Sequence, residues 1–319
     1  MAKFRKNHNS NYSKSSEKRG SSSSKTTLIR SIFFFVGICI LIYILSGVKS
    51  DSWEETDTKT ESSNNIEISN SKGTSVESSF YPESTTGQVI THKHYVLSYS
   101  EEHEQAEWVA YKLTEDNLRK PRTKREKKFR QDGLISTLSA KHNDYTRSGY
   151  TRGHLAPAGD MAFSKEAMRE SFFMSNMSPQ LKEFNGGIWR ELEENVRDWA
   201  FDNDALYIVS GPILQDGHII KQIGYNKVSV PDQFYKIILD LEDPQKKSIA
   251  FLMPNEKSIL PIKNYIVSID EIEELTGIDF FADFLSEEDE EKLEKIGDPN
   301  QWDFDQKKFQ KRINIWNNY

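Results

Sequence analysis

The sequence predicts one α+β domain over residues 89–319. Four segments rich in β-branched and aromatic residues are typical of strands, at 94–100, 205–214, 234–241 and 248–254. A helix is predicted between 185 and 200, because apolar residues recur there at helical spacing: Ile188, Trp189, Leu192, Val196 and Trp199. Strands and helices mixed over about 230 residues, with no internal repeat, indicate a single domain of this class.

The remaining elements are shorter. Residues 101–113 are expected to form a helix or a helix-to-strand junction, and 165–176 a helix at its start. Asn185 stands directly before the apolar stripe of the 185–200 helix, in the position of an N-cap. The acidic run 286–295 is expected to be a solvated helix.

The first 88 residues divide into three segments of different composition. Residues 1–30 are basic and contain too little apolar surface to fold, so we expect a disordered cytoplasmic tail. Residues 31–48 include seventeen uncharged residues, Ile32 to Val48, and predict a single transmembrane helix, with a cleavable signal peptide as the alternative. Residues 49–88 are polar and of low complexity, which is typical of a flexible linker.

Charge sets the expected location and limits the partners. The first 50 residues contain nine Lys/Arg and one Glu, so the positive-inside rule keeps the N-terminus cytoplasmic and places the domain outside the cell membrane. The whole chain carries a net charge of −7, so residues 51–319 carry −15. That balance argues against a polyanion-binding surface over the whole domain, and a nucleic-acid site must be a local patch. One cysteine, Cys39, excludes an intramolecular disulfide.

One short motif combines groups suited to phosphodiester hydrolysis. Arg152, Gly153 and His154 follow one another, and Asn185 and Glu193 come in the next apolar block. A neutral imidazole can take a proton from water near pH 7, and an amide oxygen is a ligand that suits Mg²⁺. Arginine offers a planar fork for phosphate oxygens. A base, a singly ligated magnesium ion and arginines together fit attack of water on a phosphodiester.

A basic run lies upstream of this motif. Residues 119–130 contain eight Lys/Arg and one acid, in a domain that is acidic overall. Alone, such a run is typical of a solvated loop. Directly before a histidine and arginine motif, it predicts an edge that follows a phosphate backbone.

Two blocks carry a resemblance to a known family. The segments DYTRSGYTRGHLAPAGDM (144–161) and SFFMSNMSPQLKEFNGGIWRELE (171–193) resemble the DNA/RNA non-specific endonucleases, the ββα-metal nucleases, which include secreted bacterial nucleases and mitochondrial endonuclease G. The likeness covers about 89–319. It implies a ββα-metal finger within a central mixed or antiparallel sheet flanked by helices, with DNA and RNA as substrates and Mg²⁺ as cofactor, Mn²⁺ being a possible substitute.

The resemblance also assigns roles to residues of this chain. It makes His154 the general base, Arg152 a phosphate-facing arginine and Asn185 the metal ligand. It places Glu193 near the metal-bound waters, and it adds Asn176 to the site. A further arginine aimed at the scissile phosphate falls on Arg125, with Arg122 as the alternative register.

One position departs from the family pattern. The family motif usually begins with Asp, and here that position is Thr151. Two functions are therefore expected from different classes: an active membrane-anchored endonuclease, or a weak or inactive nuclease-like module that binds nucleic acid outside the cytoplasm. Retention of both the base and the metal ligand favours the enzyme. A mitochondrial relative behind a targeting segment would change the location and leave the chemistry as it is.

Overall fold

The computed structural model describes residues 80–242, 245–281 and 284–318, and these residues fall in one compact unit. Its centre is a seven-stranded sheet in the order β1-β2-β3-β6-β9-β10-β11, in which every neighbouring pair is antiparallel. The strands are β1 (Val89–Thr91), β2 (Val96–Ser100), β3 (Gln105–Thr114), β6 (Ala205–Pro212), β9 (Gln233–Asp240), β10 (Lys247–Pro254) and β11 (Ile266–Val267). The expected α+β class with an antiparallel sheet agrees with this arrangement.

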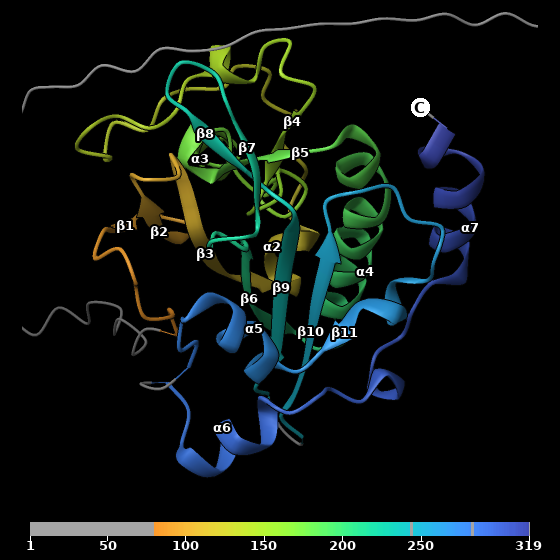
Figure 1. Ribbon diagram of the computed structural model, residues 1–319. Coiled ribbons are helices and arrows are strands. Elements are labelled where there is room, and N and C mark those ends of the chain that lie inside the picture. The colour runs from red at the N-terminus through yellow and green to blue at the C-terminus, as the bar shows by residue number, and fades with distance from the viewer. Residues whose placement is uncertain (1–79, 243–244, 282–283, 319) are drawn as a thin grey trace, which may run out of the picture. The chain divides into compact units, whose positions relative to one another are not determined.

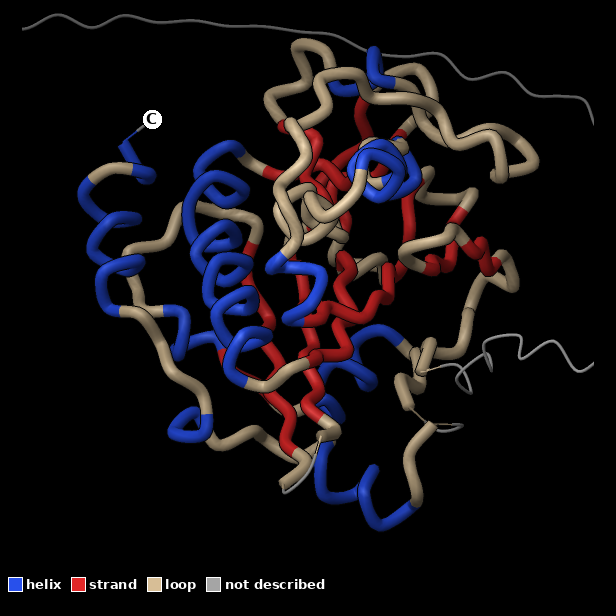
Figure 2. Tube along the Cα trace, turned by 180° about the vertical axis from the view of Figure 1, so that it is seen from behind, coloured by secondary structure: helices blue, strands red, loops and turns tan. Residues whose placement is uncertain are grey.

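Helices cover both faces of the sheet. Helix α4 (Trp189–Asp202) packs Leu192 and Val196 on one face, in the same core cluster as Ile208 and Ile238. Helix α5 (Ile269–Thr276) packs on the other face, in a cluster with the alternate strand residues such as Val209 and Ile237. Both faces are buried because side chains alternate along each strand. Figure 2 shows α4 in front of the sheet, whereas in Figure 1, seen from the other side, α5 lies in front.

Two small sheets and a short helix gather at one end of the large sheet (Figure 1). The first sheet pairs β4 (Thr151–His154) with β5 (Met177–Gln180), and the second pairs β7 (Ile219–Ile223) with β8 (Val228–Pro231). Helix α3 (Lys165–Glu170) lies between β4 and β5 in the chain, and the π-helical turn η3 (Phe184–Ile188) leads from β5 into α4. The two strands β4 and β5, followed by α4, form a ββα unit.

The peripheral helices are α2 (Glu115–Arg119), α6 (Glu287–Leu293) and α7 (Gln306–Asn314), and short 3-10 segments join the rest. The predicted strands coincide with β2, β6, β9 and β10, and the start of 165–176 is helical as expected. Residues 101–113 form no helix: a turn leads into β3, whose residues lie almost wholly in the interior. A strand buried on both faces has no polar alternation, so its sequence looks like that of a buried helix.

The start of the folded part and the acidic run also differ from expectation. Phe80 is buried, and the Glu83 amide donates to Asp279 O at 3.1 Å, so packing begins before residue 89. The acidic run contains the exposed helix α6, but the residue that follows it, Glu294, is buried.

The predicted membrane anchor, 31–48, lies outside the described residues. In the ranges that the structure describes, no helix is both long and apolar enough to cross a membrane. The longest of these, α4, has 14 residues, which span about 21 Å, whereas a bilayer core is about 30 Å thick. This finding contradicts the predicted transmembrane helix. The single-pass membrane location depended on that helix and is corrected with it.

Candidate active site

Strand β4 positions the histidine of the motif. His154 is the last residue of β4 and pairs with Met177 of β5, and the Leu155 amide donates to Asn176 O at 3.1 Å. The strand approaches β5 closely at Gly153, where an added Cβ would lie 2.1 Å from the Gln180 side chain. A larger residue there would force the buried Gln180 side chain to move, so the glycine before the histidine allows the strands to pair as they do.

His154 is a buried, neutral imidazole. Its exposure is 7%, and among the described residues nothing hydrogen bonds to its Nε2. Burial and the positive charge of Arg125 together lower the pKa of His154 to about 3, against the opposing effect of a hydrogen bond with the Arg152 backbone. The lone pair of an unprotonated ring nitrogen is therefore available at neutral pH.

Two phenylalanines surround the imidazole and also hold the arginines. The ring centroid of Phe172 lies 4.8 Å from that of His154, and the centroid of Phe129 lies 6.0 Å from it. The guanidinium of Arg125 lies 5.2 Å from the Phe172 ring, and that of Arg152 lies 5.3 Å from the Phe129 ring. Because the two rings are themselves in contact at 5.0 Å, one aromatic pair sets the positions of the base and of both cations.

The two arginines differ in their remaining partners. Arg152 donates to His142 O at 2.8 Å and lies 5.5 Å from the Tyr145 ring, and its buried Nε has no partner among the described residues. Arg125 is exposed, and it acts electrostatically on both His154 and Glu193. The alternative, Arg122, instead donates to Gly159 O at 3.2 Å. These contacts favour Arg125 over Arg122 as the upstream arginine.

Asn185 belongs to the π-helical turn η3, so it does not cap α4 as expected, and its backbone amide donates to Leu181 O. Its side-chain Nδ2 donates to Thr151 Oγ1 at 2.8 Å, and that hydroxyl donates to Gln180 O at 2.9 Å. A hydroxyl has one proton to give, so Thr151 can only accept from Asn185. The Asn185 amide must therefore present its nitrogen to Thr151, which leaves Oδ1 for a cation.

Glu193 lies in the second turn of α4, beside a set of buried charges. Burial and the negative charge of Asp160 raise the pKa of Glu193 to about 7, against the opposing effect of three cations, Arg197, Lys236 and Arg125. Arg197 donates to Asp160 at 2.8 Å, and Tyr111 donates to the other Asp160 oxygen at 2.7 Å. Burial of Asp160 is thereby compensated by two donors.

Lys236 is a buried cation in strand β9 of the large sheet. It is 1% exposed, donates to Ser210 Oγ, and lies 4.8 Å from the Trp189 ring. Burial, with a smaller effect of Arg197, lowers the pKa of Lys236 to about 8, against the opposing effect of Glu193 and Asp160. Lys236 shares its face of β9 with Phe234 and Ile238 and reaches the same helix, α4, that carries Glu193.

Asn176 lies behind the histidine, without exposure to solvent. Its Oδ1 accepts from the Ala156 amide at 2.8 Å, and its Nδ2 donates to Ala156 O and Ser171 O at 3.0 and 2.9 Å. Backbone groups engage both polar atoms of the side chain, so Asn176 fixes the chain that leaves His154. It is a positioning residue.

Several residues of the site carry no signal strong enough to be singled out from the sequence. Gln180 is fully buried, and in the described part of the chain neither side-chain polar atom has a partner. Arg197 could have been found from its position four residues after Glu193 on a helix. Lys236 is a lone charge in an apolar strand. The partners of Asp160 come from distant strands and from α4, and no local pattern indicates them.

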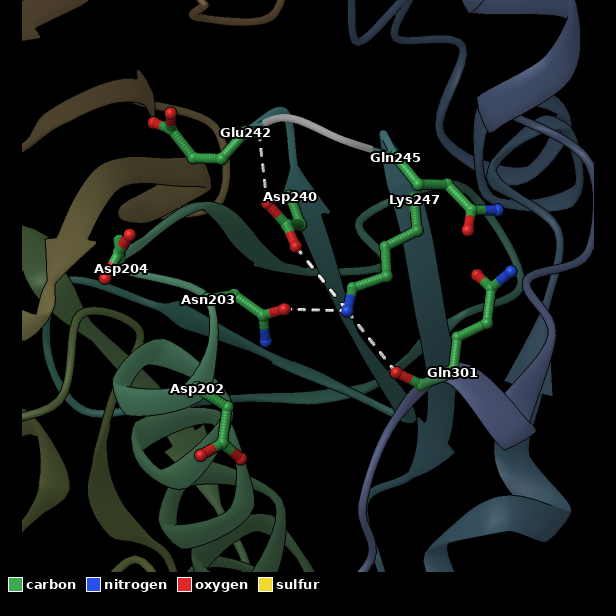
Figure 3. A pocket seen from close by; sticks show the side chains of 8 residues that line it. All are labelled: Asp202, Asn203, Asp204, Asp240, Glu242, Gln245, Lys247 and Gln301. Atoms are coloured by element: carbon green, nitrogen blue, oxygen red, sulfur yellow. Dashed lines mark hydrogen bonds and ion pairs between the residues drawn. The ribbon is translucent and has the colours of Figure 1, made fainter.

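Another hollow, of about 380 Å³, lies at the opposite end of α4 (Figure 3). The Lys247 ammonium occupies its centre and contacts Asn203 Oδ1 at 2.7 Å, Gln301 O at 3.4 Å and Asp240 at 3.5 Å. Its one cation is thus already satisfied, and its lining contains no histidine. This hollow therefore lacks the groups expected of the active site, which we place around His154.

Comparisons with known proteins agree with the geometry. The family described as DNA/RNA non-specific endonuclease matches residues 72–287. The mitochondrial nuclease EXOG of Danio rerio is 36% identical over 201 residues, which are 59% of this chain and 59% of that protein. The mitochondrial endonuclease G of Homo sapiens is 32% identical over 211 residues, 62% of this chain and 71% of that protein.

A bacterial relative and a solved structure extend the comparison. A nuclease of Nostoc sp. is 34% identical over 200 residues, 59% of this chain and 71% of that protein. A crystal structure of the EndoG/EndoGI complex matches with a TM-score of 0.58 at 32% identity, over 62% of this chain and 86% of that chain. The chain thus spans less than two thirds of the length of some curated relatives, 59% for the EXOG of Danio rerio.

Proposed function

Because this chain belongs to the DNA/RNA non-specific endonuclease family, we propose that it is a hydrolase that cleaves phosphodiester bonds of DNA and RNA with little sequence preference. The single observation that carries this function is the state of His154. A buried, neutral imidazole with an unpartnered Nε2, held between two aromatic rings beside two arginines, is arranged to accept a proton next to a phosphate.

In the proposed reaction, His154 takes a proton from a water molecule. The water oxygen forms a bond to phosphorus, and the bond from phosphorus to the 3′ oxygen breaks. The leaving 3′ oxygen takes a proton from a second water molecule, and His154 returns its proton to the hydroxide that remains, so the products are a 5′-phosphate and a 3′-hydroxyl. The pKa of His154 is low in the free enzyme. It rises when a phosphate anion approaches, because a negative charge favours the imidazolium. The base therefore becomes stronger in the substrate complex than in the free protein.

Arg152 and Arg125 would contact the phosphate oxygens. Each guanidinium is stacked near an aromatic ring, which limits the side-chain freedom that it loses on binding substrate. Fixed positive charges that face a pentacoordinate phosphorus stabilise the charge that develops there. Arg125 also keeps His154 unprotonated in the free enzyme, since its charge lowers the pKa of the imidazole.

The donor set fits a hard divalent cation. Asn185 would hold it through Oδ1, which is available because the amide nitrogen is engaged with Thr151. A single neutral oxygen ligand suits Mg²⁺, which keeps most of its waters, and Mn²⁺ accepts the same ligand. When bound, the cation supplies positive charge at the phosphate and the leaving oxygen. Glu193 would accept hydrogen bonds from the hydrated ion, and a cation nearby favours its charged form.

A basic groove would follow the nucleic-acid backbone. It has a volume of about 780 Å³ and is lined by the segment 121–127 together with Lys165 and Met168. Its four exposed cations beside Arg125 are Arg122, Lys124, Lys127 and Lys165. Arg125 belongs to the groove and also acts on His154, so the groove leads to the base. Phosphate contacts of this kind bind without reading sequence.

The function is tested with the full-length chain, supercoiled plasmid and RNA, each with Mg²⁺ or with EDTA. We expect both substrates to be degraded with Mg²⁺ and to stay intact with EDTA. Intact substrates under both conditions, together with a salt-sensitive gel shift, would overturn the proposal in favour of a binding module. In the sequence, Thr151 is the feature that favours the binding module. In the structure, its hydroxyl accepts a hydrogen bond from Asn185, the proposed metal ligand.

A further inference from the structure

Three carboxylates meet where α6 ends and α5 begins, away from the proposed active site. One ligand oxygen from each of Asp270, Glu273 and Glu294 lies within 4.8 Å of the others. The two helices are joined there by the backbone, since the Ile269 amide donates to Glu294 O at 2.8 Å. Asp270 is exposed, Glu273 is half-buried and Glu294 is buried, so the cluster is open to solvent on one side.

Glu294 is an acid without a donor. It is 8% exposed, and in the described ranges nothing hydrogen bonds to its buried Oε1. A buried carboxylate oxygen is costly unless a donor or a cation compensates it. Glu273 accepts a hydrogen bond from the Phe280 amide at 3.0 Å. This donor serves Glu273 and does not compensate the buried oxygen of Glu294.

The charge around Glu294 is negative. Burial and four neighbouring acids together raise the pKa of Glu294 to about 8; the acids are Glu273, Glu290, Asp270 and Asp279. Burial likewise raises the pKa of Glu273, with Asp279 and Asp270 adding to the effect. Repulsion between these acids is offset most strongly by a cation of high charge bound among them.

The donor set selects the kind of cation. All three ligands are carboxylates, which suit hard cations and disfavour zinc or copper. Ca²⁺ accepts several carboxylates at about 2.4 Å in flexible geometry, so one ion can contact all three acids where they converge. Mg²⁺ is smaller and is usually bound by one or two carboxylates and several waters.

We propose that Asp270, Glu273 and Glu294 bind a structural Ca²⁺ ion that fastens the end of α6 to the start of α5. The ion compensates the unpartnered oxygen of Glu294, and water completes its coordination on the side of Asp270. Because α5 covers one face of the large sheet, the ion stabilises the packing on that face.

The test uses the full-length chain with Asn185→Ala, which removes the proposed catalytic metal ligand, and Ca²⁺ alone as the probe. Calorimetric titration and melting temperature are measured for this chain and for three further variants made in it. Glu294→Gln removes the buried charge, and Asp270→Asn changes an exposed ligand, so that folding is not at risk. Glu288→Gln is the control, because Glu288 is an exposed acid of α6 outside the cluster.

We expect Ca²⁺ to raise the melting temperature of the parent and of Glu288→Gln by a few degrees. Both cluster variants should bind Ca²⁺ roughly tenfold or more weakly than the parent and Glu288→Gln. An equal response in control and cluster variants would overturn the proposal. So would the absence of binding heat and of a melting shift in the parent up to about 10 mM Ca²⁺. Neither readout depends on nuclease activity.

Discussion

The Asn185 amide donates a 2.8 Å hydrogen bond to the hydroxyl of Thr151. Thr151 stands where the family motif usually has an aspartate, and this contact gives it a role: its hydroxyl accepts from Asn185 and donates to Gln180 O. The hydroxyl of Thr151 thus orients the side chain of Asn185, the proposed metal ligand.

Thr151→Val removes this hydroxyl while keeping the shape of the side chain. The Asn185 amide can then rotate, so we expect half-maximal activity to require roughly tenfold or more Mg²⁺. The measurement is the cleavage rate as a function of Mg²⁺ concentration. Thr151→Ser keeps the hydroxyl and should retain the metal dependence of the original chain. An unchanged metal requirement in Thr151→Val would show that Asn185 is held by other means.

Gly153→Ala places a Cβ 2.1 Å from the Gln180 side chain, which is buried between the strands. We expect a loss of roughly 1–3 kcal/mol in the free energy of unfolding and a large loss of activity, because the pairing of β4 with β5 positions His154. Gly133→Ala is the matched control, since nothing lies within 4 Å of the added atom there. The melting temperatures of both variants are measured by thermal unfolding. Equal values would contradict the close approach of β4 to β5 at Gly153.

The buried His154 makes stability depend on pH. Its folded pKa of about 3 lies below the value of about 6.5 in the unfolded chain, so the folded state binds fewer protons between these values. The contribution of His154 to stability is therefore complete above pH 6.5 and falls as pH decreases, by about 1.4 kcal/mol per pH unit. His154→Asn should lack this dependence.

The measurement is urea unfolding in EDTA at pH 6.5 and 5.0. The original chain should lose about 2 kcal/mol more than His154→Asn over this interval. Equal losses in the two proteins would mean that the imidazole titrates in the folded state as it does in water.

Lysines of the basic groove should set the salt dependence of substrate binding. Lys124→Ala, Lys127→Ala and Lys165→Ala should each lower the slope of log affinity against log salt by about 1, for DNA and RNA alike. Lys295→Ala is the control, because Lys295 is exposed and follows α6 closely in the chain. Helix α6 lies at the other end of the view in Figure 1. Fluorescence anisotropy with His154→Ala as background avoids cleavage. A change of slope in the control as large as in the groove variants would contradict the assignment.

The sequence predicts the elements of this fold that have a regular pattern or a distinctive composition. The apolar stripe of Leu192 and Val196 indicates α4, and β9 and β10 are indicated by their β-branched and aromatic residues. Strand β3 is mistaken for a helix or a junction, because it is buried on both faces and so shows no alternation.

The site is predictable only in part, for a similar reason. His154, Arg152 and Asn185 stand in recognisable blocks, but their partners are set by tertiary contacts. Nothing local to the sequence brings Phe129 against Phe172, or Thr151 against a residue 34 positions away. Asn185 resembles a helix cap in the sequence, whereas a π-helical turn places it against β4.

If the proposed function is right, His154 performs the chemical step and is not needed for substrate binding. The most direct measurement is single-turnover cleavage of a labelled duplex with saturating Mg²⁺, by the original chain and by His154→Ala, with affinity measured on the same duplex. We expect a rate loss of about 10²–10⁴ or more, with affinity changed by a small factor. Cleavage by His154→Ala at the original rate would contradict it.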